Sequence, residues 1–264
     1  MSEAEAREIR RRTFETTAAL YERYRPTYPA ALFDDVRAYA DLAPDDAILE
    51  VGAGTGRATV HLARWGNPMV VIEPAPAMTE IIRANVAEHS HVDVRTTTFE
   101  GADVERNAFG LVVVARAFGW LDPATRVERI HQALYAYGSV ALVNNFQVTT
   151  PEWLPFFERV QAVYLAHAPE IAHQGAFPSA DDVPEHELKD EPLFGDHQQP
   201  EHPWEWTLSA EDYVGLMSTH SPHAALEPDV RERLHEGIVD LINAAFGGVV
   251  TEHYVAIAAL ARRV

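Results

Sequence analysis

The apolar positions between residues 29 and 145 switch repeatedly between a spacing of about 3.6 residues and a spacing of about two residues. The first spacing predicts helices with one apolar face, and the second predicts strands. Helices and strands alternate along this stretch, which is typical of βα units that build a parallel sheet. The predicted helices are Ala30–Leu42, Arg57–Trp65, Pro76–Glu88 and Asp122–Tyr135, and the predicted strands are Ala47–Val51, Met69–Ile72, Val92–Thr97, Leu111–Ala115 and Ser139–Val143.

The alternation ends at Asn145, and the rest of the chain has a different pattern. Residues 181–202 contain eight acids, one lysine and three prolines, a composition that predicts an exposed loop. Ser209 and Asp212 have the spacing of a capping box at the start of a helix. The other predicted elements are a helix over Glu152–Ala166, a strand over Trp204–Leu208, a helix over Val230–Ala245 and a final strand over Val250–Leu260.

A glycine-rich turn joins the first predicted strand to the next helix, in the sequence ILEVGAGTG of residues 48–56. Gly52 allows a sharp turn, and Gly54 leaves room where a Cβ atom would strike a ligand. The helix that follows Gly56 offers unpaired backbone N–H groups to such a ligand. The same glycines also suit a tight turn that binds no ligand. A second sequence feature is needed to decide whether this turn binds a ligand.

Glu73 supplies that second element, because it ends the next predicted strand about 20 residues after the turn. An acidic side chain at this place can accept hydrogen bonds from both hydroxyls of a ribose, which favours an adenosine-containing ligand. A dinucleotide-binding turn would carry its third glycine at position 57, where this chain has Arg57. The pattern disfavours NAD, and an NAD(P)-dependent oxidoreductase is the weaker alternative.

Charge and composition narrow the classes of partner. The 264 residues carry 21 Lys and Arg against 40 Asp and Glu, a formal net charge of −19, so we expect neither nucleic acid nor an anionic membrane as a partner. The chain has no cysteine, which excludes disulfides and thiol chemistry and agrees with a cytoplasmic location. The charged N-terminus lacks the apolar core of a signal peptide, and no apolar run approaches the roughly 20 residues of a membrane span.

Several segments form one series along the chain: the glycine turn, VIEPAPAM at residues 71–78, Phe99-Glu100, and FGLVVVARAFGWLDPA at residues 109–124. In this series the chain resembles the class I S-adenosylmethionine-dependent methyltransferases, in particular the small-molecule branch of that family. The segment YERYRPTYP, residues 21–29, is similar to the N-terminal segment that folds over the cofactor in that branch. The resemblance covers nearly the whole chain, and it implies S-adenosylmethionine as cofactor and S-adenosylhomocysteine as product.

The resemblance also implies which residues hold the cofactor. Glu73 would take the ribose-binding place, Met78 would lie near the adenine, and Arg25 would pair with the carboxylate of the methionine moiety. The full implied set is Tyr24, Arg25, Glu50, Gly52, Ala53, Gly54, Thr55, Gly56, Glu73, Pro74, Met78, Phe99, Glu100, Ala115, Arg116, Ala117 and Trp120.

Three departures from the family pattern bear on the acceptor and on proton handling. Gly110 stands where many relatives carry an acid, Gly119 stands where they often carry a histidine, and residues 135–139 replace an Arg-Pro-Gly-Gly turn. A glycine cannot act as a base, as an imidazole could. The alternative function is therefore a cofactor-binding protein of the same fold that has lost methyl transfer or uses the cofactor for other chemistry.

No motif assigns a catalytic residue, and a base is needed only if the methyl acceptor arrives protonated. The candidates are Tyr24, Trp120, His173 and His220. The 13 histidines show no metal-protease spacing and fall in predicted helix ends and loops, so we expect no metal site.

These observations predict one α/β domain: a Rossmann-like, doubly wound, seven-stranded sheet with an antiparallel last strand and a helical cap inserted after strand five. The predicted parts of residues 1–264 are an N-terminal lid at 1–28, a cofactor-binding core at 29–145, the cap at 146–203 and the C-terminal part of the sheet at 204–264. The predicted activity is methyl transfer from S-adenosylmethionine to a small molecule, with substrate choice set by the cap and by Trp120.

Overall fold

A computed structural model describes residues 18–172 and 177–264, and every helix and strand predicted between residues 29 and 145 is present in it. The helices are α2 (Ala30–Ala40), α3 (Thr59–Ala63), α4 (Pro76–Asn85), α5 (Arg126–Ala133), α6 (Leu154–His167), α7 (Ala210–Ser218), α8 (Ser221–Ala224) and α9 (Pro228–Ala245). The strands are β1 (Ala47–Val51), β2 (Met69–Glu73), β3 (Val92–Thr96), β4 (Phe109–Ala115), β5 (Leu134–Gln147), β6 (Phe194–Gln198), β7 (Glu201–Ser209) and β8 (Val249–Arg263). In the part of the chain described, no helix has both the length and the apolar character to cross a membrane.

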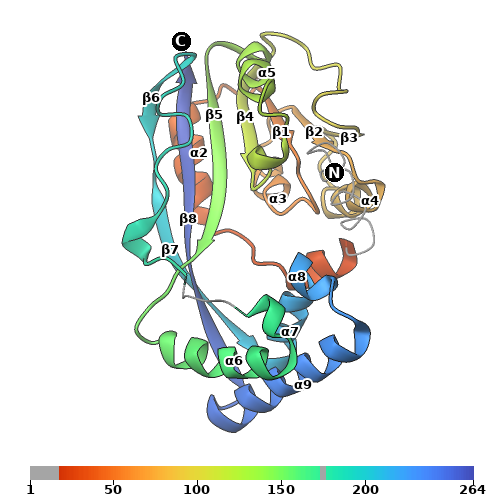
Figure 1. The fold of residues 1–264 in the computed structure, drawn as a ribbon. Coiled ribbons are helices and arrows are strands. Elements are labelled where there is room, and N and C mark those ends of the chain that lie inside the picture. The colour runs from red at the N-terminus through yellow and green to blue at the C-terminus, as the bar shows by residue number, and fades with distance from the viewer. Residues whose placement is uncertain (1–17, 173–176) are drawn as a thin grey trace.

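The described strands form one eight-stranded sheet in the order β3-β2-β1-β4-β5-β8-β6, in which β7 also pairs with β8 (Figure 1). The prediction of seven strands was one too few, because β6 and β7 both pair with β8. Strands β1 to β5 are parallel to their neighbours, and β8 runs antiparallel to β5, as predicted for the last strand. The chain order reverses between β1 and β4. In an open parallel sheet, ligands bind in the crevice at the carboxyl ends of the strands where the order reverses.

Two apolar layers bury the two faces of the sheet. On one face, α2, α3 and α4 contribute buried side chains such as Phe33, Leu62 and Ile82. On the other face, α5 packs Ile130 and Ala133 over the strands. Burial of apolar surface on both faces is what makes a doubly wound sheet stable.

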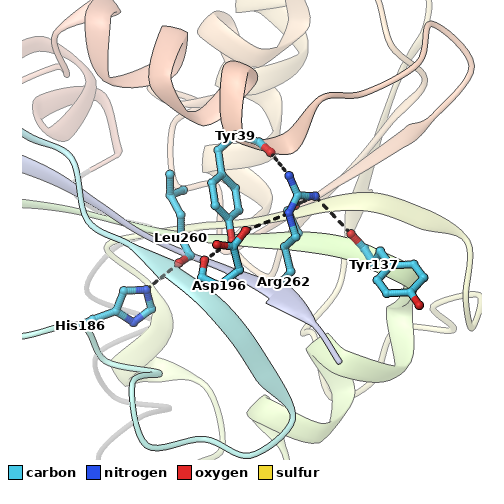
Figure 2. Close-up of polar contacts among 7 residues, drawn as sticks. Tyr39, Tyr137, His186, Asp196, Leu260 and Arg262 are labelled. Carbon is cyan, nitrogen blue, oxygen red and sulfur yellow. Dashed lines mark hydrogen bonds and ion pairs between the residues drawn. The ribbon is translucent and has the colours of Figure 1, made fainter.

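The far edge of the sheet differs from the prediction, because residues 181–202 contain β6 and the start of β7 and are not simply an exposed loop. Both strands pair antiparallel with β8, so they share one edge position. The Arg262 guanidinium of β8 stabilises this edge by donating to the Asp196 carboxylate at 3.3 Å and to the Tyr39 carbonyl at 2.6 Å (Figure 2). The Tyr39 hydroxyl donates to the Asp196 carbonyl at 2.5 Å. These contacts join residues that are far apart in the sequence. They explain why part of the segment forms a strand, although its acidic composition predicted a loop.

Helices α6, α7, α8 and α9 gather below the sheet, at the end where β5 leads into α6 (Figure 1). Phe156 of α6, Tyr213 of α7 and Ile238 of α9 belong to one buried apolar cluster. His223 connects α8 to α6 and α9 by hydrogen bonds, so the four helices form a single cap. The segment 146–203 contributes α6 to this cap, whereas α7, α8 and α9 come from 204–264. Apolar spacing predicted the α9 helix, but the surface that covers it lies far away in the sequence.

Candidate active site

The glycine turn between β1 and α3 adopts the backbone conformation that only glycine adopts readily. Gly52, Gly54 and Gly56 have φ angles of +69°, +59° and +89°. A Cβ atom on Gly52 would lie 2.5 Å from the Cβ of Ala117, so a side chain there would displace its neighbour. A Cβ atom on Gly54 would meet nothing within 4 Å, because Gly54 faces a cavity.

This first cavity has a volume of about 450 Å³ and lies at the carboxyl ends of β1, β2 and β4. Its position is the one expected for the ligand crevice of a doubly wound sheet. Most of the predicted cofactor-binding residues line it: Arg25, Gly52, Ala53, Gly54, Thr55, Glu73, Pro74, Met78, Phe99, Glu100, Ala115, Arg116, Ala117 and Trp120.

Glu73 is buried at the end of β2, and both oxygens of its carboxylate accept backbone hydrogen bonds. The Gly54 N–H donates to Oε2 at 2.9 Å, and the Ala75 N–H donates to Oε1 at 3.0 Å. A carboxylate oxygen has two lone pairs, so these bonds are compatible with a further bond from a ligand hydroxyl. Glu73 therefore holds the glycine turn in shape as well as lining the cavity.

Residues 18–28 cover one side of the cavity. Arg57, which directly follows the glycine turn, holds this segment by donating from its guanidinium to the carbonyl of Glu22. Arg25 donates from Nη2 to the carbonyl of Thr219 at 3.0 Å, and so connects the segment to the cap. The part of the predicted lid that precedes residue 18 lies outside the described residues.

Three predicted cofactor-binding residues, Tyr24, Glu50 and Gly56, do not line the cavity. The ring of Tyr24 packs on α7, since a Cβ atom on Gly215 would lie 2.4 Å from it. Glu50 is fully buried on β1. Burial raises the pKa of the Glu50 carboxyl to about 8, and the negative charge of Glu73 acts in the same direction.

The cavity also contains residues that the sequence analysis missed. The aromatic residues of YERYRPTYP could have pointed to Tyr21 and Tyr28, but no motif marks Thr219, which comes from the cap. The missed residues are Tyr21, Pro26, Tyr28, Val51, Arg57, Ala58, Ile72, Ala75, Thr98, Leu121, Thr219, Ser221 and Pro222.

A second cavity, of about 610 Å³, lies between the sheet and the cap helices. Its wall is mainly aromatic and aliphatic, and includes Phe146, Val148, Trp153, Phe157, Val160, Tyr164, Ile171, Phe177, Val183, Tyr213, Leu216, Met217 and Tyr254. Arg25, Pro26, Arg116, His220 and Pro222 line both cavities. We call these five residues the junction, because the two cavities meet there.

The junction is positively charged. Arg25 is half-buried, and burial lowers the pKa of its guanidinium, with the nearby charge of Arg116 acting in the same direction. Arg116 donates to the carbonyl of Asn145 at 2.8 Å and has a φ of +53°, an unusual conformation for a residue with a side chain. Neither guanidinium forms an ion pair with any described residue, so both are available to a ligand carboxylate.

Residues 48–138, which hold the glycine turn and Glu73, match the family model described as a methyltransferase domain. The chain is 26% identical over 231 residues to an uncharacterized methyltransferase-like protein of Schizosaccharomyces pombe, which covers 87% of this chain and 86% of the relative. The chain therefore contains a methyltransferase domain.

Solved structures share the fold of this methyltransferase. One described as a type II methyltransferase, from Anaeromyxobacter dehalogenans, has a TM-score of 0.59 at 20% identity and covers 91% of this chain and 97% of its own. The phosphoethanolamine N-methyltransferase 2 of Haemonchus contortus, solved with S-adenosylhomocysteine, has a TM-score of 0.51 at 13% identity and covers 94% of this chain and 57% of its own.

S-adenosylmethionine is the cofactor of this methyltransferase. The first cavity fits such a ligand, because the space in front of Gly54 is open and would be reduced by any side chain there. The buried Glu73 carboxylate offers an acceptor for hydroxyl groups, and the Arg25 guanidinium, which uses one N–H group for the Thr219 carbonyl, offers further donors for a carboxylate.

Gly110 stands where many relatives of this methyltransferase carry an acid, and packing around Gly110 explains why a side chain does not fit there. A Cβ atom on Gly110 would lie 2.7 Å from Leu42 Cδ2 and 2.8 Å from the Tyr135 hydroxyl. Gly110 and Tyr135 are therefore linked departures, since the tyrosine occupies the space that a side chain at position 110 would need. A Cβ atom on Gly119 would meet nothing within 4 Å.

The four predicted catalytic candidates of the methyltransferase differ in which of the two cavities they line. His220 is half-buried and lines both cavities. Trp120 lines the first cavity and is not part of the wall of the second, as far as the described residues go. Tyr24 lines neither cavity, and His173 lies outside the described residues.

Glu252 of β8 is fully buried behind the second cavity, where Trp153 Nε1 donates to its carboxyl at 3.3 Å and Gln147 Nε2 also donates. Burial raises its pKa from 4.5 to about 7. The folded state therefore binds this proton more tightly than the unfolded state, so the free energy of unfolding falls as pH rises from about 4.5 to 7.

We expect Glu252→Gln to be more stable than wild type at pH 8.5 by about 1 to 3 kcal/mol, because a neutral side chain avoids burial of a charge. At pH 4 the two proteins should differ little. Urea denaturation at both pH values measures this, with Glu232→Gln on the exposed face of α9 as the control. Equal pH dependence in Glu252→Gln and wild type would contradict the prediction.

Proposed function

We propose that this chain transfers the methyl group of S-adenosylmethionine to a small molecule bound in the second cavity. The observation that carries the proposal is the junction, where the two cavities share Arg25, Arg116 and His220 among their lining residues. Ligands in the two cavities would bring their reacting ends together at the junction. Such alignment can contribute on the order of 7 to 11 kcal/mol to a transfer reaction.

The assignments on the cofactor side follow from the first cavity. We assign Glu73 to the ribose hydroxyls and Arg25 to the carboxylate of the methionine moiety, because each presents the matching hydrogen-bond chemistry to the cavity. When bound, the cofactor supplies a methyl group on a positively charged sulfur, which is an activated donor. The role of residues 18–28 would be to cover the cavity and exclude water.

The size and wall of the second cavity support a small and largely apolar acceptor. Its volume of about 610 Å³ lies in the range of small-molecule sites, and its wall is mainly aromatic and aliphatic. The net charge of −19 disfavours nucleic acid as a substrate. The lack of cysteine supports the cytoplasm as its location. We assign His220 to contact with the acceptor, because its side chain lines both cavities.

Calorimetry with S-adenosylmethionine, S-adenosylhomocysteine and NAD tests the cofactor side, and we expect binding of the first two only. Transfer of a radioactive methyl group to a panel of hydroxylated, carboxylated and amino compounds tests the reaction. Binding of the cofactor without transfer to any member of the panel would favour a protein that has lost methyl transfer. Binding of NAD alone would favour the oxidoreductase.

A larger side chain in the second cavity should separate acceptor binding from cofactor binding. Val160 lies on α6 and lines the second cavity only, so Val160→Phe should raise the KM for the acceptor by about tenfold and leave cofactor affinity within twofold. Leu165→Phe is the control, because Leu165 is on the same helix and 63% exposed. Equal KM values in Val160→Phe and Leu165→Phe would contradict the assignment of this cavity to the acceptor.

A further inference from the structure

A chain of hydrogen bonds runs through the cap from the second cavity toward solvent. The Tyr164 hydroxyl of α6 lies 3.0 Å from Nε2 of His223 on α8. Nδ1 of His223 lies 3.1 Å from Nε2 of His235 on α9. These three residues, which we call the relay, come from separate helices that lie together in the cap (Figure 1).

The burial of the relay changes from one end to the other. Tyr164 and His223 are 5% and 4% exposed, and both line the second cavity. His235 is half-buried and lines neither cavity. His223 follows Pro222 of the junction directly, so the middle member of the relay lies near the place where the two cavities meet. The relay therefore connects the interior of the second cavity with the outside of the cap.

The hydrogen bonds require a consistent direction. Nδ1 of His223 and Nε2 of His235 lie within hydrogen-bond distance, so one of them carries the shared proton and the other accepts it. If Tyr164 donates to Nε2 of His223, then His223 is protonated at Nδ1 and donates to His235. The two hydrogen bonds of the relay then point in the same direction. A proton can therefore move outward along the relay, by one transfer across each hydrogen bond.

We propose that the relay removes a proton from a hydroxyl group of the methyl acceptor, which makes the acceptor a phenol or an alcohol. The inference rests on the proposed function of the second cavity. Tyr164 is the residue that contacts the acceptor hydroxyl, and His223 and His235 act through it. The cavity around Tyr164 is lined by aromatic rings, which suits a phenol.

The proton leaves the acceptor through a series of transfers along the relay. The acceptor O–H bond breaks as the Tyr164 oxygen takes that proton, and the proton of Tyr164 passes to Nε2 of His223. The Nδ1 proton of His223 passes to Nε2 of His235, which becomes positively charged and then releases a proton to solvent. The acceptor oxygen keeps the electron pair of the broken bond, and this pair is the nucleophile.

Two acceptors that differ in ionisation give the sharpest test. At pH 7.5 the hydroxyl of 4-methylphenol is protonated, whereas pentafluorophenol is already ionised. We expect Tyr164→Phe to lower the rate of methyl transfer to 4-methylphenol by about 100-fold or more, and transfer to pentafluorophenol by less than about threefold. His235→Asn should show the same pattern with a smaller loss, about tenfold. Cofactor affinity should not change in either variant.

His167→Asn is the matched control, since His167 is a half-buried histidine of the cap that lines neither cavity. A second measurement needs no acceptor: the ring ¹⁵N chemical shifts of His223, measured by NMR. We expect Nε2 to have the shift of an unprotonated nitrogen and Nδ1 that of a protonated one. Tyr164→Phe and His235→Asn should move these shifts, and His167→Asn should not.

Several results would overturn the relay while leaving the proposed function intact. One is transfer to carboxylic acids or amines only, with none to either phenol. Another is an equal loss for both phenols in Tyr164→Phe, which would indicate a structural role. A third is a loss of methyl-transfer rate in His220→Asn only. A fourth is a set of His223 ¹⁵N shifts that stays the same in Tyr164→Phe and His235→Asn. Failure of wild type to bind S-adenosylmethionine would instead overturn the proposed function.

Discussion

Gly54→Val should lower the affinity for S-adenosylmethionine by roughly 100-fold or more, which is about 2.7 kcal/mol, while the protein stays folded. Gly54 has a φ of +59°, and a Cβ atom there would meet nothing within 4 Å of the protein itself. A valine side chain would therefore cost backbone strain but no clash with the protein at its Cβ atom. It would occupy the space of the first cavity that the cofactor needs.

Gly66→Val is the matched control for this effect. Gly66 has a φ of +83°, and a Cβ atom there would also meet nothing within 4 Å, but Gly66 lies outside the first cavity. The two variants should lose similar stability in thermal unfolding, and only Gly54→Val should lose binding in calorimetry. Unchanged affinity in Gly54→Val would mean that the glycine turn is only a turn.

Glu73→Ala should weaken cofactor binding by about 2 to 4 kcal/mol, roughly 30- to 900-fold, because two hydrogen bonds to a charged group are lost. The structure adds a second cause. The Glu73 carboxylate accepts from the backbone N–H groups of Gly54 and Ala75, so its removal also releases the glycine turn. Calorimetry on Glu73→Ala tests this, with Glu80→Ala on the exposed face of α4 as the control.

Glu73→Gln should lose nearly as much affinity as Glu73→Ala. One carboxylate oxygen becomes an NH₂ group, which then faces the N–H of either Gly54 or Ala75, so two donors would oppose each other. Affinity of Glu73→Ala within twofold of wild type would contradict the role of Glu73. A glutamine variant close to wild type would mean that the turn holds its shape without the carboxylate.

The cofactor half of this protein is readable in its sequence because its signals are local. Apolar spacing defines each helix and strand from the residues of that element, the glycine turn directly follows β1, and Glu73 is the last residue of β2. These short-range patterns predicted β1 to β5 and the glycine turn, and the family that the motifs resemble implied half of the residues that line the first cavity. They also predicted the antiparallel final strand, through the family that the motifs resemble.

Tertiary structure alone decided the part of the protein that we propose binds the acceptor. Arg25 and Thr219 are 194 positions apart, and Tyr164 and His223 are 59 positions apart, so no local spacing connects them. The apolar face of a helix is encoded in its own residues, but the surface that covers this face is set by the packing of the whole chain. For this reason the sequence determined that α6 and α9 are helices, and only the fold decided that α6 lines a cavity and that α9 packs with α6 in one apolar cluster.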